Sequence, residues 1–237
     1  MAKVLFLELE QESAWALASI GPACIAAYLR QSGHVVSLLR VTLNMPVQQL
    51  IGEIRAHAPD LLGVSLSSRQ WLRAGEIIPA IRSELDIPVI AGGLHATFAS
   101  DLVLQTPGFD FVCIGEGEQA MLELMEAIDH GEIPPEGILN IRAKGGPMPR
   151  LRPPFEPIDD LPFLARDMLR ERFGVVNLMT QRGCPFFGDA AVSDWQGVRL
   201  PCGESCRPPG ESPHACSAAA GPDSRGHRGI FATGLPS

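Results

Sequence analysis

The chain has 237 residues, of which 46% are hydrophobic and 19% are charged, and it carries a formal net charge of −8 at pH 7. This composition predicts a globular protein, and the length allows one large or two small domains. The net negative charge argues against binding of a nucleic acid. No apolar run approaches the roughly 20 residues that span a bilayer, and acidic residues interrupt the N-terminal stretch where a signal peptide would be apolar, so we expect a cytoplasmic protein without a membrane partner.

Residues 1 to about 143 alternate short β-rich runs with amphipathic helical patterns. Nearly continuous apolar strands separated by such helices predict a parallel sheet that is covered on both faces. The predicted fold class is therefore α/β, a doubly wound, flavodoxin-like sheet. The predicted strands cover residues 4–7, 35–39, 60–65, 88–91 and 109–114, and the predicted helices begin near residues 20, 45, 71, 97 and 118.

Three further regions follow this predicted domain. Residues 144–172 are rich in proline, which disrupts helix interiors and cannot donate to a sheet, so they are predicted to be an interdomain linker; a long surface loop of one domain is the alternative. Residues 173–187 contain an apolar strand and a loop. Residues 188–237 combine scattered glycine and proline with almost no branched aliphatic side chains, and a segment of this kind is predicted to be disordered.

The six cysteines are irregularly placed and do not make a disulfide framework in a chain of this size. Cys24 and Cys113 fall in apolar helix and strand patterns, and we expect both to be buried, inert thiols. The tail offers Cys202, Cys206, His214 and Cys216. Structural zinc usually uses two tight pairs of ligands held by a folded core, so we expect no zinc site there.

Glycine and hydroxyl residues gather in loops that should lie at one edge of the sheet. In an open parallel sheet, ligands bind outside the carboxyl ends of the strands, and residues 65–69, 92–97 and 115–118 are expected there. Glycine lets a ligand approach the backbone closely, and free amides at helix starts suit phosphate or amide oxygens. These features predict a nucleotide, a flavin or a corrinoid, with a ligand-free edge as the alternative. The missing GxGxxG and Walker motifs weaken the ordinary NAD and ATP interpretations.

Four motifs in order resemble those of cobalamin-dependent radical S-adenosylmethionine proteins. Residues 92–97 (GGLHAT) and 110–118 (DFVCIGEGE) are similar to the GGxHAT and DxVxxGEGE signatures of the cobalamin-binding domain. Residues 158–167 resemble the DLPxPARD stretch before the catalytic barrel, and residues 180–186 (TQRGCPF) resemble the strand and loop that start it. The resemblance covers residues 1–186 and implies a cobalamin-binding domain at 1–143.

The resemblance also implies where a corrinoid partner would bind. Ser65, Ser67, Gly92 and Gly93 would line the channel for the displaced nucleotide tail, and Gly115, Glu116 and Gly117 would lie beside the corrin side chains; turn glycines and capping serines are the alternative. His95, Ala96 and Thr97 belong to the GGxHAT part of the same expected site. The first loop has no histidine to bind cobalt from below. We expect His95 to make a polar contact or to help start a helix, with cobalt ligation as the alternative. Trp15 is expected in the core, with coverage of the lower corrin face as the alternative.

The cluster motif of this family begins at Cys184 and does not continue. Gly188 and Ala191 stand at the second and third positions of CxxxCxxC, and iron–sulfur clusters need thiolate ligands. Cys184 is therefore interpreted as a remnant metal ligand, and the four-iron four-sulfur cluster and S-adenosylmethionine of the intact family are expected to be absent. Out-of-frame translation of residues 188–237 is a hypothesis that sequencing the parent locus would test.

The resemblance thus implies the cobalamin-binding domain of a radical enzyme, of the methyltransferase type, cut off before its catalytic barrel. We expect such a chain to carry the cofactor and to have no catalytic residue of its own. A nucleotide- or flavin-binding α/β domain and a non-catalytic interaction module are the alternatives. The sequence indicates no particular protein partner.

Overall fold

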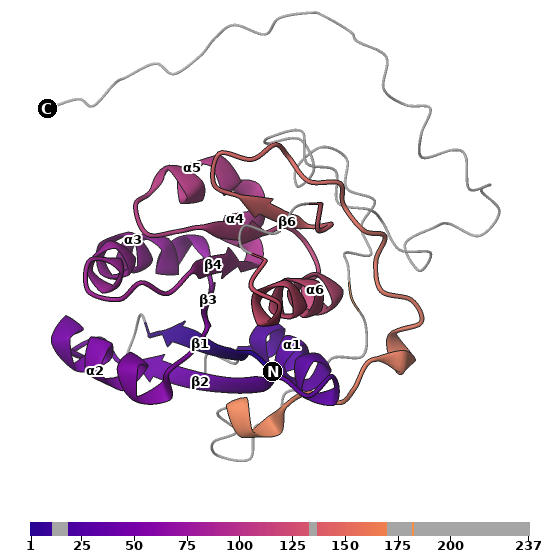
Figure 1. The fold of residues 1–237 in the computed structure, drawn as a ribbon, viewed down its shortest axis with the longest axis horizontal. Helices are drawn as coiled ribbons and strands as arrows, with labels where there is room; N and C mark the ends of the chain where they lie inside the picture. The colour runs from indigo at the N-terminus through magenta and orange to yellow at the C-terminus, as the bar shows by residue number, and fades with distance from the viewer. Residues whose placement is uncertain (11–18, 133–136, 170–181, 183–237) are drawn as a thin grey trace, which may run out of the picture.

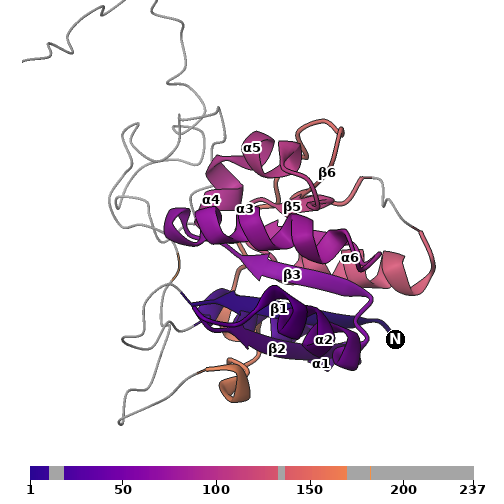
Figure 2. The ribbon, with the colours of Figure 1, turned by 90° about the vertical axis from the view of Figure 1, so that its left-hand side faces the viewer.

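A computed structural model describes residues 1–10, 19–132, 137–169 and 182. Six strands form one sheet in the order β2-β1-β3-β4-β5-β6, and helices cover both of its faces (Figures 1 and 2). The strands are β1 (Lys3–Leu9), β2 (Val35–Val41), β3 (Leu61–Ser65), β4 (Val89–Gly92), β5 (Phe111–Cys113) and β6 (Ile141–Ala143). The helices are α1 (Ile20–Gln31), α2 (Val47–His57), α3 (Ser68–Arg82), α4 (Gly93–Phe98), α5 (Ser100–Gln105) and α6 (Glu118–Asp129), with 3-10 turns η1 (Ile158–Asp160) and η2 (Arg166–Met168).

The sheet is parallel from β2 through β5, and only β6 runs antiparallel to its neighbour. The strand order reverses between β1 and β3, the topological switch point of a doubly wound sheet. The predicted flavodoxin-like α/β class is confirmed. The short edge strand β6 was not among the predicted strands, because its three residues carry too little pattern to stand out.

Two apolar layers hold the fold together, one on each face of the sheet. Successive side chains of a strand point to opposite faces, so Leu5 and Leu7 of β1 pack with α2, α3, α4 and α5. Val4 and Phe6 of the same strand pack with α1 and α6. The face covered by α1 and α6 is the one that carries the site described below.

Residues 144–169, called the strap below, run along the outside of α6 and α1 (Figure 1). The Phe155 ring meets Tyr28 of α1 edge-on, with centroids 6.0 Å apart, and the Ala165 amide donates to the Ala23 carbonyl at 3.1 Å. Near the end of the strap, Arg30 binds both carboxylate oxygens of Asp167 at 2.8 and 2.9 Å, and Met168 is buried. Most of the predicted linker therefore packs on the α/β unit through specific contacts, and the domain boundary at residue 143 stays a prediction.

Several predicted features lie outside the described residues: Trp15, the strand in residues 175–180, Cys184, the cysteines of the tail and the predicted disorder of residues 188–237. Within the described ranges, no helix is both long and apolar enough to cross a membrane. Cys24 and Cys113 are free and buried, as the sequence predicts.

Candidate functional site

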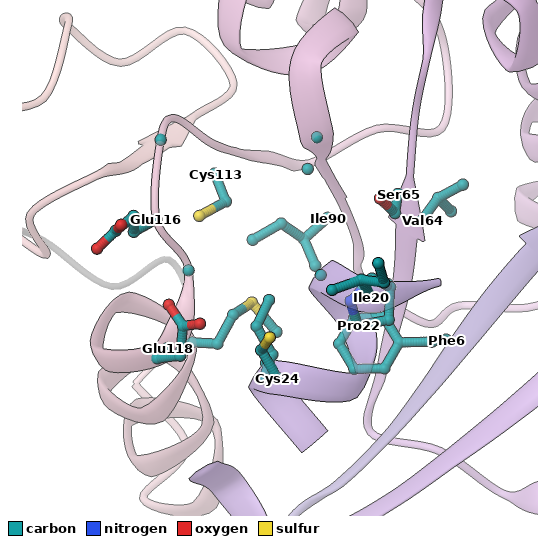
Figure 3. A pocket seen from close by; sticks show the side chains of 18 of the residues that line it. Phe6, Ile20, Pro22, Cys24, Val64, Ser65, Ile90, Cys113, Glu116 and Glu118 are labelled. Carbon is teal, nitrogen blue, oxygen red and sulfur yellow. The ribbon is translucent and has the colours of Figure 1, made fainter. Parts of the chain in front are cut away.

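A cavity of about 440 Å³ opens at the carboxyl end of the sheet, on the face covered by α1 and α6 (Figure 3). Its walls come from the first turn of α1, the ends of β3, β4 and β5, the loop at residues 115–117 and the first turn of α6. Phe6 of β1 closes one side, so the cavity reaches the switch point between β1 and β3. Six residues of the predicted cofactor site line it: Ser65, Gly92, Gly93, Gly115, Glu116 and Gly117.

Small residues on one face of the sheet create this space. Gly63 and Ser65 alternate with Leu62 and Val64 along β3, so both lie on the α1 and α6 face, and Ser65 is in register with Gly92. Beside Gly63, the Phe6 ring fills the space that a side chain would occupy, since an added Cβ would lie 2.5 Å from Cε1 of Phe6. Beside Gly92, the corresponding space is empty and belongs to the cavity.

Gly92 and Gly93 are neighbours that differ in backbone conformation and in the space available for a side chain. Gly92 has extended backbone (φ −131°, ψ −173°), and an added Cβ would meet only Cβ of Cys113, at 4.0 Å. Gly93 has φ +86°, and its Cβ would lie 2.8 Å from the carbonyl oxygen and 2.9 Å from the amide nitrogen of Leu66. Any side chain at residue 93 therefore collides with backbone, whereas a side chain at residue 92 would enter the cavity.

The other four residues of the predicted site do not line the cavity. Ser67 caps α3, with its Oγ accepting from the Gln70 amide and the Gln70 side chain accepting from the Ser67 amide. Ala96 is buried in the layer on the opposite face of the sheet. Thr97 Oγ1 accepts a hydrogen bond from the Gly115 amide at 3.2 Å. Thr97 thereby supports a turn whose glycine has φ +81°.

His95 packs beside the site through contacts with α3. Its ring stacks on Trp71 with centroids 4.8 Å apart and an angle of 23° between the planes. Its Nδ1 lies 3.4 Å from Ser68 Oγ, and whether the ring binds cobalt stays a prediction. Burial lowers the pKa of His95 below its ordinary value, which favours the neutral form of the ring.

A charged group forms one wall of the cavity. Nη2 of Arg182 lies 2.5 Å from Oε1 of Glu118, and Nη1 lies 3.5 Å from Oε1 of Glu116. Glu116 also accepts a hydrogen bond from the Phe155 amide of the strap, at 2.7 Å. Burial lowers the pKa of Arg182, but the hydrogen bond to Glu118 and the attraction of both carboxylates outweigh it, and the net shift is upward. Arg182 is therefore a permanent cation in this wall.

Two thiols complete the lining (Figure 3). Burial, followed by the nearby charge of Glu118, raises the pKa of Cys113 to about 12. Burial also raises the pKa of Cys24, against the opposing effect of Arg182. A thiol must lose its proton to act as a nucleophile or metal ligand, so both cysteines serve at neutral pH as small apolar wall residues. Among the described residues, no group of three or more His, Cys, Asp or Glu side chains could hold a metal ion.

Sequence reasoning missed the part of the wall that α1 supplies, namely Ile20, Pro22 and Cys24, and it missed Glu118 and Arg182 as wall residues. In the sequence, Glu118 and Arg182 stand out only as members of the GEGE and RGCPF motifs. No pattern in the sequence predicts that these two motifs lie in contact. Alternation along β3 could have flagged Gly63 and Ser65 as a small-residue stripe on one face.

Comparisons with known proteins show which family this part of the chain resembles. A family model described as the B12 binding domain matches residues 14–125. Residues 14–125 are thus similar to the B12 binding domain. The predicted resemblance to cobalamin-dependent radical S-adenosylmethionine proteins is confirmed, and the nucleotide, flavin and interaction-module alternatives are not favoured.

Two curated proteins are similar over much of the chain. An uncharacterized methyltransferase of Pyrococcus horikoshii is 28% identical over 181 residues, which are 70% of this chain and 39% of that protein. The anaerobic magnesium-protoporphyrin IX monomethyl ester cyclase of Rubrivivax gelatinosus is 28% identical over 183 residues, which are 69% of this chain and 33% of that protein. The chain thus spans 39% of the first relative and 33% of the second, well under half of either protein.

Solved structures share the fold of the described α/β unit. The radical S-adenosylmethionine methyltransferase TsrM from Kitasatospora setae, with cobalamin and a [4Fe-4S] cluster bound, gives a TM-score of 0.56 at 21% identity, over 65% of this chain and 30% of that one. The cobalamin-dependent S-adenosylmethionine radical enzyme OxsB, with aqua-cobalamin and S-adenosylmethionine bound, gives 0.57 at 17% identity, over 71% and 24%.

Proposed function

We propose that the cavity at the carboxyl edge receives the nucleotide tail of cobalamin, with the corrin ring above the loops that surround its mouth. The family match supports cobalamin as the ligand. The observation that carries the location is the open space at Gly92, where an added Cβ would meet nothing closer than 4.0 Å. In a doubly wound sheet, ligands bind outside the carboxyl ends of the strands at the topological switch point, and this cavity reaches that point.

The lining suits the chemistry of such a tail. Phe6, Ile90 and Met121 give apolar walls for an aromatic base, and Ser65 can donate a hydrogen bond from its Oγ. Gly115 lets the loop backbone come close to the corrin side chains. The Glu116 carboxylate already pairs with Arg182 and accepts a hydrogen bond from the Phe155 amide. We therefore propose that Glu116 stabilises the loop at residues 115–117 and does not contact the cofactor.

We further propose that the chain is part of a cytoplasmic, cobalamin-dependent radical S-adenosylmethionine enzyme of the methyltransferase type. The order of the four motifs and the similarity to a methyltransferase of Pyrococcus horikoshii support this role. When bound, cobalamin would supply a cobalt that carries a methyl group. The residues of this domain would bind and orient the cofactor. Because Gly188 and Ala191 cannot bind iron, we propose that this chain by itself forms no four-iron four-sulfur cluster.

The proposal is tested by equilibrating the purified chain with hydroxocobalamin, cobinamide, FMN or ATP and measuring retention after gel filtration. Cobinamide has the corrin ring but no nucleotide tail. We expect retention of hydroxocobalamin at close to one equivalent, much weaker binding of cobinamide, and no retention of FMN or ATP. Equal affinity for the two corrinoids would refute the tail channel. Loss of all corrinoid on the column would refute cobalamin binding.

A further inference from the structure

Glu8 is a buried carboxylate that does not line the cavity. It lies near the carboxyl end of β1, and its side chain is 4% exposed. Its two oxygens accept hydrogen bonds from different segments: Oε2 from Nε of Arg40 on β2, at 2.8 Å, and Oε1 from the hydroxyl of Ser19. A buried carboxylate needs such partners because burial removes its hydration. Glu8 therefore ties β2 to the start of α1.

The hydrogen bond from Ser19 is made in place of a helix cap. Ser19 is the N-cap residue of α1, a position where serine usually accepts a hydrogen bond from an amide of the first turn. Within the described part of the chain, the Ser19 side chain makes no such bond. Its hydroxyl donates to Glu8 instead. This departure from the local preference indicates that the contact with Glu8 serves the tertiary structure.

The start of α1 is also a wall of the cavity. Ile20, Pro22 and Cys24 line that space, and they follow directly after Ser19 in the chain. Because a helix moves as a rigid element, a shift of its first turn displaces all three side chains. The shape of the cavity on this side thus depends on the bond between Ser19 and Glu8.

Arg40 extends the connection to the strap. Its Nη2 donates to the Met168 carbonyl at 2.8 Å, in the η2 turn that lies beside α1 and β2 (Figure 1). One guanidinium can serve both acceptors because its donors have a fixed, planar geometry. Met168 is buried in the same apolar layer as α1 and α6. A continuous series of hydrogen bonds therefore runs from the strap through Arg40, Glu8 and Ser19 to the cavity wall.

We propose that Glu8 and Arg40 are positioning residues for the cofactor site, which hold the α1 wall of the cavity and couple it to the docked strap. Neither side chain lines the cavity, so both act through α1. Because the coupling between two sites is reciprocal, a ligand that needs the α1 wall in place also stabilises the docked strap. The identity of that ligand as cobalamin rests on the function proposed above.

The test measures hydrogen exchange by mass spectrometry in the full chain, first without cofactor. Two segments are followed: residues 19–25 at the start of α1, and residues 164–169 of the strap, which include the amide that is bonded to α1. Glu8→Gln keeps the size of the side chain and removes its charge. We expect exchange in both segments to become severalfold faster in Glu8→Gln and in Arg40→Met, because each change opens the connection between them.

Arg82→Met is the matched control. Arg82 is about as exposed as Arg40, at 23% against 26%, and it belongs to α3, which packs on the opposite face of the sheet. We expect this variant to exchange like the parent in both segments. Ser19→Ala removes only the link to α1, so it should loosen the start of α1 more than the strap.

Circular dichroism of each variant confirms that the domain is folded. Parent-like exchange of both segments in folded Glu8→Gln and Arg40→Met would overturn the coupling. A change confined to one of the two segments in both variants would overturn it as well, because the proposed series of hydrogen bonds connects them.

Hydroxocobalamin titrations of the same variants test the link to the cofactor. In the parent, bound hydroxocobalamin should slow the exchange of residues 164–169 severalfold. Glu8→Gln and Arg40→Met should bind it severalfold more weakly, whereas Arg82→Met should bind like the parent. Parent-like affinity in both folded variants would overturn the positioning role. If the parent binds no hydroxocobalamin, the proposed function fails, while exchange in the cofactor-free chain still decides whether Glu8 and Arg40 couple α1 to the strap.

Discussion

Replacing Gly92 with valine should block the cavity and leave the fold intact. The backbone at Gly92 is extended, a conformation that valine prefers, and an added Cβ meets only Cβ of Cys113, at 4.0 Å. If cobalamin fills this space, the valine side chain competes with it, and forcing extra carbon atoms into a packed space typically costs about 1–3 kcal/mol. That free energy corresponds to a Kd for cobalamin about 5- to 150-fold weaker.

The Gly92→Val experiment compares cobalamin titrations, followed by visible absorption, with thermal unfolding of the same samples. Gly52→Val is the matched control, because Gly52 is exposed on α2 and an added Cβ there meets no described atom within 4 Å. We expect the control to bind like the parent and both variants to unfold within about 0.5 kcal/mol of it. A folded Gly92→Val chain with the parent Kd would refute the tail channel.

Gly93→Val should unfold the domain at lower temperature, losing more than about 1 kcal/mol, because φ is +86° and the Leu66 backbone is in the way; parent-like melting would contradict this. His95→Ala should leave the corrin bands of the bound cofactor unchanged, since the ring contacts Trp71 and Ser68, and a clear band shift would instead show cobalt ligation. The hydrogen bond from Arg30 lowers the pKa of Asp167. The ion pair therefore stabilises the folded state at any pH above the pKa of Asp167 in the unfolded chain, about 4. This stabilisation is lost as the pH falls through the lower pKa of the folded state. For this exposed pair the effect of Asp167→Asn at pH 7 should be below about 1 kcal/mol, with faster proteolysis of the strap; a proteolysis rate equal to the parent's would show that the pair does not anchor it.

Local patterns in the sequence determine the class of fold and the edge where the site lies. The apolar run Leu61–Ser65 must be a buried strand, and a parallel sheet sends the residues that follow each strand to the same edge. This is why Ser65, Gly92 and Gly115 could be grouped before their positions were known, and why they meet in one cavity. Periodicity carries this information because side-chain direction repeats with the backbone.

The tertiary structure decides what each of these residues does. Gly92 and Gly93 look alike in the sequence, but in the fold the Leu66 backbone leaves no room for a side chain at Gly93, whereas the space at Gly92 is free. Glu118 and Arg182 are 64 residues apart, and no local preference encodes a contact at that separation. Such pairs form because a buried charge requires a partner from whichever segment the fold brings near, and that segment is known only once the sheet, its helices and the strap have packed.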